Sequence, residues 1–513
     1  MKKIIVLFLI AFALRVWFVS DHNIIFWYDS ARDAIKASQI WQGNLTLMGP
    51  AASGTNDSVY HGALYYYLLA PWYGISNGDP AWPTYFLAFL GAVAVPLNYW
   101  LGFSITKNKF FSLVFAGTTA FSSQAIVLST LLTNPTMALV MFPVFFLCVW
   151  KLFYERNSGV RWWILLGFSY GWLVQSVIWL FPLLFIPVIS AIMLLKNNPD
   201  RVKIVFRPRS ILISLFVATL MVSSMLFTQF KLYKAGIFTP QNISEGNKAN
   251  QRASMQLFSE YLTIYGARIT SIYFPSHSII ALLFFAYLLT NSTHLPTNRK
   301  QFYLLLFASP IFISIIFPRK NEFFFYMMDI PLYLFAIDVL LKDKISTKNS
   351  ALIILAIIFV FSNIFELQYY RNNHVSIIDT WGTTLSDSIR LVDETYKISK
   401  GATFSIDSFT DPYKYNTVWS YLYSWYGKNK YGYTPVFTGS SQIGTVNEGL
   451  LPESSQAEAF HFAIIQPNPV ISQQYFDDFL SIQQRKTDTN SLLSVYGTTK
   501  LLTYNKEINS KLH

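Results

Sequence analysis

The run KKIIVLFLIAFALRVWFV, residues 2–19, decides the fold because it is apolar over the length that a helix needs to cross a lipid bilayer. Its basic flank and apolar stretch also fit a secretory signal peptide. However, Arg15 interrupts the run, the small-x-small cleavage pattern is missing, and many further apolar segments follow. We therefore expect a retained membrane helix that runs outward, with Lys2 and Lys3 in the cytoplasm.

Apolar runs of similar length recur along the chain, and each is long enough for a membrane-spanning helix of roughly 17–25 residues. Including the first, they lie near residues 4–20, 84–104, 110–130, 135–152, 161–177, 178–195, 210–230, 276–291, 301–317, 323–341 and 350–367. Counted from a cytoplasmic N-terminus, these eleven spans place every strongly basic linker but one inside, as the positive-inside rule requires. We expect a multi-pass protein of the plasma (inner) membrane.

The composition excludes an ordinary soluble enzyme. Of the 513 residues, 53% are hydrophobic and only 13% charged, against roughly 25% charged in a typical soluble domain. The net charge of +12 comes from residues 1–369, with 27 basic and 14 acidic side chains, whereas residues 370–513 hold 12 basic and 13 acidic ones. Basic residues scattered between apolar runs indicate membrane topology, so we expect membrane lipids and no nucleic acid as partners. The single cysteine, Cys148, excludes an intrachain disulfide.

The first outer loop, residues 21–83, is too long and too regular for a simple connector. Within FWYDSARDAIKASQIWQGNL at 26–45, small and apolar residues recur at helical spacing from Ala31 to Trp41, which predicts an amphipathic interfacial helix. A Gly/Pro/Ser-rich loop, MGPAASGTNDS at 48–58, follows. The segment YHGALYYYLLAPWYGI at 60–75 is rich in the aromatic residues of the membrane–water boundary. It predicts a second surface helix, with a short true span as the alternative.

Residues 370–513 are polar and nearly neutral. Strand-like runs, ATFSID at 402–407 and FHFAIIQ at 460–466, alternate with helix-like runs, TVWSYLYSWYG at 417–427 and QYFDDFLSI at 474–482. This pattern predicts a small α/β domain with its own core. The predicted fold is therefore an α-helical polytopic membrane domain over residues 1–369, with about eleven transmembrane helices and surface helices in its first outer loop, followed by an extracytoplasmic α/β domain over 370–513.

Candidate chemistry gathers on the outer face, since the chain has no zinc, Walker or nucleophile-elbow motif. Asp29 and Asp33 are spaced i, i+4, so both carboxylates project from one helix face, with Arg32 beside them. A carboxylate at the membrane surface can act as a general base for an acceptor hydroxyl. The alternative is that these three residues are the solvated face of the helix. His61 and Asn134 are weaker candidates, and the Asn-Pro at 134 also fits a helix cap.

Arg319 and Lys320, in FPRKNEFFFY at 317–326, are the exception to the charge rule, because they fall on the outer side directly before an apolar span. One interpretation is that they reach lipid phosphates at the bilayer surface, as basic residues at span ends often do. The other is that they bind an anionic headgroup of a substrate. The sequence pattern alone leaves both interpretations open.

The order of these segments over about residues 1–341 resembles a known family. The matching pieces are YDSARDA at 28–34, IWQGNL at 40–45, YHGALYYYLLAP at 60–71, and the basic-aromatic segment from Arg319 through Tyr326 to Pro331. Together they resemble the polyprenyl-phosphate-sugar-dependent glycosyltransferases of the GT-C superfamily, in the branch of dolichyl-phosphate-mannose protein mannosyltransferases and lipid A aminoarabinose transferases.

The resemblance implies an inverting hexosyl- or pentosyltransferase with a polyprenyl-phosphate sugar donor and a glycan, lipid or protein acceptor. It implies Asp29 as the general base, with Asp33 as a second acid. The remaining residues that it implies are Arg319, Lys320 and Arg32 at the donor phosphate, and Tyr60, His61, Asn134 and Tyr326 at the substrate.

Two departures from the family pattern affect what it implies about the substrate and the metal. Ser30 stands where members often carry a second adjacent acid, and the later turn reads His61-Gly62-Ala63 and not His-Pro-Pro. Some GT-C enzymes hold a divalent ion through a second acidic motif, but the equivalent region here is TNPTM at 133–137. We therefore expect metal-independent catalysis without a cofactor.

Two other functions are compatible with such a membrane protein. An O-antigen ligase or polymerase also handles polyprenyl-linked glycans outside the membrane, but usually carries its large outer loop late in the chain. A polyprenyl-linked glycan transporter needs charged groups within its spans and usually repeated halves. Few charges interrupt these spans, and the two halves do not match.

Overall fold

The computed structural model describes most of the chain. The described residues are 2–52, 58–155, 157, 159–197, 205–238, 263, 266–267, 278–316, 327, 329–340, 349–373, 384–410, 415–439, 450–466, 471–487 and 491–505.

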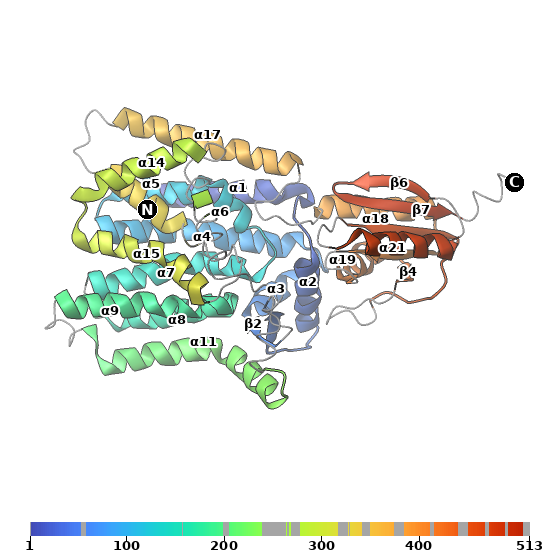
Figure 1. The fold of residues 1–513 in the computed structure, drawn as a ribbon, viewed down its shortest axis with the longest axis horizontal. Helices are drawn as coiled ribbons and strands as arrows, with labels where there is room; N and C mark the ends of the chain where they lie inside the picture. The colour runs from blue at the N-terminus through green and yellow to red at the C-terminus, as the bar shows by residue number, and fades with distance from the viewer. Residues whose placement is uncertain are drawn as a thin grey trace.

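A bundle of roughly parallel helices forms the larger part of the molecule (Figure 1). Its helices are α1 Lys2–Val19, α4 Ala81–Thr106, α5 Lys109–Phe121, α6 Ser123–Leu128, α7 Ala138–Val149, α8 Val160–Ser176, α9 Phe185–Asn197, α11 Pro208–Lys234, α14 Ser278–Asn291, α15 Thr297–Ile316, α16 Asp329–Leu340 and α17 Asn349–Asn373. Short helical turns extend several of them, namely η1 Ser20–His22, η2 Asn134–Met137, η3 Trp150–Tyr154, η4 Ile178–Leu184 and η5 Ser292–His294. A helix therefore lies on each of the eleven apolar runs.

Within the described part of the chain, five helical segments are long and apolar enough to cross a membrane. They are Lys2–His22, Ala81–Thr106, Asn134–Tyr154, Ile178–Lys196 and Pro208–Lys234. The chain is thus a mostly helical protein with membrane-spanning segments, and the full number of eleven spans stays a prediction.

The run at 110–130 is not one straight helix. It is divided at Ser122, which leaves the helical conformation with a φ of −60° and a ψ of 120°. The Ser122 side chain accepts a hydrogen bond from the backbone N–H of Ala125, so it caps the start of α6. Hydropathy did not show this break, because the short polar stretch from Ser122 to Gln124 lies between two longer apolar segments.

Arg15 of α1 is the buried cation that interrupts the first apolar run. It is 1% exposed, and Nε donates to Ser129 Oγ at 2.9 Å. Its Nη1 and Nη2 donate to the backbone carbonyls of Ala11 and Thr119, at 3.0 and 3.3 Å. Neutral oxygens thus satisfy this guanidinium, which explains how an arginine is accommodated between packed helices.

Residues 21–83, predicted as the first outer loop, fold over the ends of the bundle. Helix α2, Tyr28–Trp41, and helix α3, Leu64–Ile75, pack against each other, and Figure 1 shows α2 lying across the direction of the bundle helices. The two helices expected here are therefore present. The loop at 48–58 also contains strand β1, Met48–Ala51, which pairs antiparallel with β2, Tyr60–Gly62. The sequence analysis did not predict this pairing.

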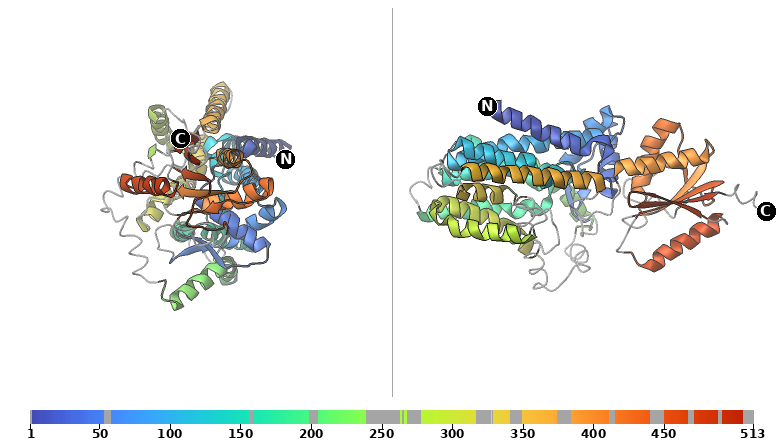
Figure 2. Two further views of the ribbon diagram at one scale, coloured as in Figure 1. Left: turned by 90° about the vertical axis from the view of Figure 1, so that its right-hand side faces the viewer. Right: turned by 90° about the horizontal axis from the view of Figure 1, so that it is seen from above.

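The C-terminal residues form a five-stranded mixed sheet in the order β4-β3-β5-β7-β6. Its strands are β3 Phe404–Phe409, β4 Val436–Phe437, β5 Phe460–Ile465, β6 Ser491–Tyr496 and β7 Thr499–Asn505, and its helices are α18 Leu385–Ser399, α19 Thr417–Leu422, η7 Tyr423–Gly427, α20 Lys428–Tyr431 and α21 Gln473–Thr487. Strands β4, β3 and β5 are parallel, whereas β7 is antiparallel to both β5 and β6. Figure 2 shows α18 and α21 on opposite faces of the sheet.

Alternation along the strands determines which residues meet each helix. Phe404 and Ile406 of β3 join the core beneath α18, whereas Phe409 packs against Phe479 of α21. The odd-numbered positions of β3 also carry Asp407 to the α21 side. That face of the sheet therefore holds polar groups as well as apolar ones.

The sheet region and the first outer loop share one hydrophobic core. Trp419 and Tyr421 of α19 belong to the same buried cluster as Phe26 and Ala31 of the loop. The two segments are also joined through the backbone, since Leu385 N donates to Ile24 O at 2.7 Å. The C-terminal residues therefore rest directly on α2.

Candidate active site

Helix α2 assembles an ion cluster from three of its own residues, Asp29, Arg32 and Asp33, which we call the α2 ion cluster. Arg32 Nη1 contacts Asp29 Oδ1 at 2.7 Å. Its Nε and Nη2 both contact Asp33 Oδ1, at 2.8 Å each. One guanidinium therefore holds both carboxylates, as the i, i+4 spacing of the aspartates and the intervening arginine allow.

The three members of the cluster differ sharply in exposure. The side chain of Asp33 is 1% exposed and that of Arg32 10%, whereas that of Asp29 is 40% exposed. The alternative of a simple solvated helix face therefore fails for Arg32 and Asp33, because α3 and α19 both pack on α2. Asp29 keeps a carboxylate that a substrate could reach from solvent.

Burial also changes the proton affinity of Asp33. Its pKa rises from 3.8 to about 7, chiefly because the side chain is removed from water; Arg32 opposes the rise, and the negative charge of Asp29 adds to it. Asp33 consequently titrates near neutral pH, although its cation partner favours the ionised form.

Two aromatic residues that the sequence analysis did not single out line the cluster. The Arg32 guanidinium carbon lies 5.7 Å from the centre of the Tyr28 ring. Tyr66 of α3 is buried, and its pKa is raised well above its ordinary value by burial and then by the charge of Asp33. The only sequence signal was the aromatic run at 65–67, which did not show which tyrosine would face the cluster.

His61 lies in β2, near Arg32, and is neutral. Burial, and then the positive charge of Arg32, lower its pKa to about 3. Its Nδ1 accepts a hydrogen bond from the backbone N–H of Ile178 at 3.0 Å, so the ring proton stays on Nε2. The structure therefore brings His61 to the same region as the α2 ion cluster, with the tautomer fixed by the bundle.

Gly62, the next residue, packs closely against Gln175 of α8. A Cβ at Gly62 would clash with the Gln175 side chain, and one at Gly49 would clash with the Gly62 backbone carbonyl. The β1–β2 hairpin thus packs directly on the end of α8, which fixes the height of His61 above the bundle.

Asn134 is buried and acts as a structural tie in this conformation. Its Nδ2 donates to the carbonyl of Ser176 at the end of α8, at 2.5 Å. Close by in sequence, Leu132 O accepts a hydrogen bond from Ser30 Oγ at 3.2 Å, which ties α2 to the bundle. The predicted contact of Asn134 with substrate stays a prediction.

The other predicted site residues are Tyr60, Arg319, Lys320 and Tyr326. Tyr60 is half-buried in β2, adjacent to His61. Arg319, Lys320 and Tyr326 lie outside the described residues. Across the part of the chain that the structure describes, no group of three or more His, Cys, Asp or Glu side chains gathers as it would around a metal ion.

Solved structures with a similar arrangement of elements include two of oligosaccharyltransferases and one of ArnT. The oligosaccharyltransferase AglB from Archaeoglobus fulgidus, in complex with an inhibitory peptide and a dolichol-phosphate, is 11% identical, with a TM-score of 0.44 over 90% of this chain and 69% of AglB. An A. fulgidus oligosaccharyltransferase in complex with Zn and sulfate is 12% identical, with a TM-score of 0.46 over 90% of this chain and 67% of that one. ArnT from Cupriavidus metallidurans, bound to undecaprenyl phosphate, is 10% identical, with a TM-score of 0.40 over 97% of both chains.

AglB and ArnT are GT-C superfamily enzymes, the class that the sequence resembles. No model of a protein family matches the chain, and no curated protein matches it. Identities of 10–12% and TM-scores below 0.5 carry no argument about activity, so the function has to be argued from the residues of this chain.

Proposed function

We propose that this chain is an integral membrane glycosyltransferase that moves a sugar from a polyprenyl-phosphate-linked donor to an acceptor hydroxyl on the outer face of the membrane. The observation that carries the proposal is the α2 ion cluster, which joins a solvent-facing carboxylate to a buried ion pair across the ends of the bundle. A site at the ends of the bundle helices suits a substrate whose lipid tail lies in the bilayer while its phosphate and sugar lie at the surface. The sugar transferred is a hexose or a pentose.

In the proposed reaction, Asp29 is the catalytic base. It takes the proton of the acceptor hydroxyl, and the acceptor oxygen then forms a bond to the anomeric carbon. The bond between that carbon and the phosphate oxygen breaks, and polyprenyl phosphate leaves with the electron pair. Because the base and the leaving group lie on opposite faces of the sugar, the configuration inverts.

Arg32 and Asp33 are positioning residues in this proposal. The two contacts of Arg32 with Asp33 Oδ1 fix the guanidinium, and Arg32 in turn fixes the Asp29 carboxylate. An orientation that already exists before the substrate binds avoids reorganisation during the reaction.

The leaving phosphate needs fixed positive charge, and the reaction as proposed takes it from the chain without a metal ion. Arg319 and Lys320 supply it, and the positive charge of Arg32 adds to theirs. Tyr60, His61, Asn134 and Tyr326 complete the substrate site in this proposal. The Nε2–H of His61 is a hydrogen-bond donor of fixed tautomer, which suits a sugar hydroxyl.

The proposal is tested with purified protein in lipid nanodiscs, a panel of polyprenyl-phosphate sugars and total envelope extract as the acceptor. We expect the wild type to release polyprenyl phosphate and to label an acceptor. We expect Asp29→Asn to lose about 100-fold or more of that rate while it still binds the donor, because general-base catalysis contributes roughly 10²–10⁴-fold.

Asp21→Asn is the matched control. Asp21 is an aspartate of the same loop whose side chain is 83% exposed and pairs with Arg371, outside the α2 ion cluster. Its substitution should leave the rate within about twofold, because exposed ion pairs contribute little. Equal rates for wild type and Asp29→Asn would show that Asp29 is not the base. If the wild type turns over no donor, the proposed glycosyltransferase function is rejected.

A further inference from the structure

The C-terminal sheet carries a pocket of about 730 Å³ on its α21 side, which we call the sheet-edge pocket. Its floor is Asp407 and Ser408 near the end of β3, and one wall is Thr438 and Gly439, directly after β4. Helix α21 forms the opposite wall. The volume falls within the roughly 300–1,000 Å³ of typical small-molecule sites.

The topology of the sheet favours a binding site at this place. The chain passes from β3 to β4 on one side and then to β5 on the other side of β3, and all three strands are parallel. The direction of winding thus reverses at β3. In open α/β sheets, ligands bind outside the carboxyl ends of the strands at such a reversal.

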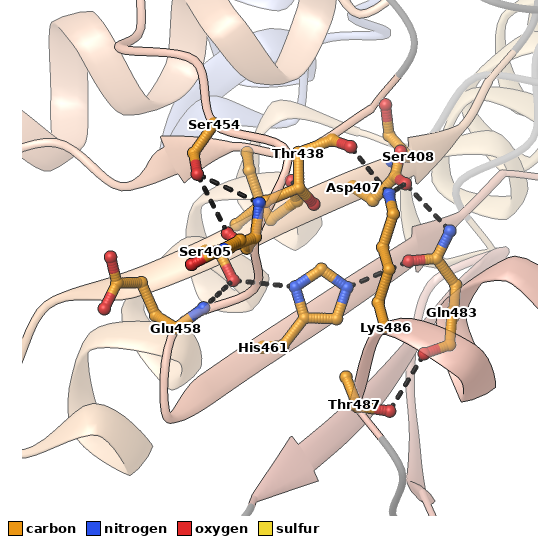
Figure 3. A network of polar contacts seen from close by, with 12 residues as sticks. Ser405, Asp407, Ser408, Thr438, Ser454, Glu458, His461, Gln483, Lys486 and Thr487 are labelled. Atoms are coloured by element: carbon orange, nitrogen blue, oxygen red, sulfur yellow. Dashed lines mark hydrogen bonds and ion pairs between the residues drawn. The ribbon is translucent and has the colours of Figure 1, made fainter.

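A buried polar network holds Asp407 in the floor of the pocket (Figure 3). The Asp407 Oδ2 atom accepts hydrogen bonds from Gln483 Nε2 and Lys486 Nζ, at 2.8 Å each. His461 is fully buried, and its ring nitrogens lie 2.8 Å from Ser405 Oγ and 2.9 Å from Gln483 Oε1. We call these five residues the β3–α21 network. The carboxylate is therefore preorganised before any ligand arrives.

The backbone after β4 also closes on this carboxylate. A Cβ at Gly439 would lie 2.6 Å from Asp407 Oδ1, so any larger residue would have to displace the carboxylate. Lys486 Nζ additionally donates to the carbonyl of Thr438 at 2.6 Å, which ties α21 to the same turn. The floor and both walls of the pocket are thus held together around Asp407, which is 6% exposed.

The lining of the pocket fits a carbohydrate better than a phosphate. Three carboxylates, those of Asp407, Glu453 and Asp478, face one ammonium, that of Lys486, so the pocket repels anions. Carboxylate, amide and hydroxyl groups pair with the hydroxyls of a sugar. Tyr475 stands at the pocket with a 52% exposed side chain, and its ring offers a flat surface to the apolar face of a sugar ring.

The pocket also adjoins the candidate active site. Asn416 lines it and accepts a hydrogen bond from Ser408 Oγ at 2.9 Å. The preceding residue, Tyr415, packs its ring edge-on against Tyr28 with centroids 5.5 Å apart, and Tyr28 directly precedes Asp29. Figure 1 shows α19, which follows Asn416, beside α2. A saccharide bound in the pocket would thus lie near the proposed base.

We propose that the sheet-edge pocket binds the carbohydrate part of the acceptor, which makes the acceptor a glycan or a glycolipid. This inference rests on the proposed transferase function for its role in the reaction. The binding of an uncharged saccharide by the pocket is independent of that function.

Binding is measured with the full chain in nanodiscs. The probe is a panel of soluble di- to tetrasaccharides built from glucose, galactose, mannose and N-acetylglucosamine, read by saturation-transfer NMR. The pocket variant is Tyr475→Ala with Asp478→Asn, and the matched control is Gln474→Ala with Asp477→Asn. All four side chains are exposed on α21, but Gln474 and Asp477 do not line the pocket.

We expect at least one saccharide to bind the wild type and the control within about twofold of each other. The pocket variant should bind it at least tenfold more weakly. No saccharide binding to the wild type, or equal loss in both variants, would overturn the inference. Preference for inorganic phosphate over every saccharide would overturn it as well.

A second measurement separates this inference from the proposed function. With an active donor, we expect the pocket variant to raise the KM for the acceptor at least tenfold while donor hydrolysis without acceptor stays unchanged. An unchanged acceptor KM would reject the acceptor role and leave the transferase standing. If no donor is turned over but saccharides bind only when the pocket is intact, the proposed transferase function is rejected and the proposed carbohydrate site is kept.

Discussion

The α2 ion cluster and the β3–α21 network each hold a buried aspartate against a cation. The first is built from neighbouring residues of one helix, and the second from residues far apart in the sequence. Asp29, Arg32 and Asp33 lie within two turns of one helix. Asp407 and Lys486 are 79 residues apart and meet only because β3 and α21 pack face to face. The first cluster could be recognised from spacing, whereas the second was invisible until the sheet formed.

The difference also concerns what each aspartate offers to a ligand. In the α2 ion cluster, the buried member, Asp33, supports an exposed carboxylate on the same helix. In the β3–α21 network, the buried carboxylate itself forms the floor of a pocket. The local cluster is suited to position one reacting group, and the non-local network is suited to shape a surface. The predictions below test that contrast.

The largest expected effect is on the local cluster. Arg32→Met leaves Asp33 buried without its cation, which should lower the free energy of unfolding by about 3 kcal/mol. The loss should be larger at pH 8 than at pH 6, because Asp33 is protonated below its pKa of about 7 and needs no cation there. Chemical denaturation of the protein in detergent at both pH values measures it.

Lys397→Met is the control for that prediction. Lys397 also forms an i, i+3 ion pair, with Glu394 at 3.8 Å, but its side chain is 80% exposed. Its removal should not change stability measurably. A loss as small for Arg32→Met as for Lys397→Met would show that the α2 ion cluster does not depend on burial.

The next effect is on the non-local network. Gln483→Leu removes the bridge between His461 and Asp407, and leaves buried polar atoms without partners. We expect a loss of about 2 kcal/mol in unfolding free energy. Gln484→Leu, on the exposed side of the same helix, is the control. If both variants unfold alike, the network contributes nothing to the sheet and the contrast with α2 disappears.

A smaller effect concerns the pH dependence of turnover. The folded pKa of Asp33 is about 7 against 3.8 for the free residue, so ionising it costs stability as pH rises from about 4 to 7. Turnover should change in the opposite direction and rise through pH 7, because ionised Asp33 fixes Arg32 and thereby Asp29. A pH–rate profile should show this rise, by about tenfold between pH 6 and pH 8, and Asp33→Asn should abolish it. A wild-type profile that is flat across pH 7 would contradict the positioning role.

The smallest effect lies at the contact between the two regions. Tyr28 and Tyr415 form an edge-to-face pair, which is typically worth about 1 kcal/mol. A double-mutant cycle with Tyr28→Ala and Tyr415→Ala, read by thermal unfolding, should give a coupling of that size. Additive losses would mean that the sheet region and α2 are held together by their shared core and not by this pair.

Several elements of the fold were predictable because their signals are local. Helix α2, Tyr28–Trp41, contains the whole stretch from Ala31 to Trp41 in which helical spacing predicted a helix. Strands β3 and β5 overlap the two strand-like apolar runs at 402–407 and 460–466. The hairpin of β1 and β2 was missed, because β1 lies within the Gly/Pro/Ser-rich loop at 48–58, and Gly49 allows its close approach to Gly62 of β2.

The sequence by itself determined that the chain enters a membrane, that a helix carries Asp29, Arg32 and Asp33 on one face, and that strands and helices alternate near its C-terminal end. Apolar length and residue spacing are properties of a single segment, so they can be read without knowing what packs against that segment. Only the tertiary structure decided that Arg32 and Asp33 are buried, that His61 is neutral beside them, and that Asp407 meets Lys486. Burial and long-range contact depend on what packs against a segment, and α3, α19 and α21 supply those surfaces from distant parts of the chain.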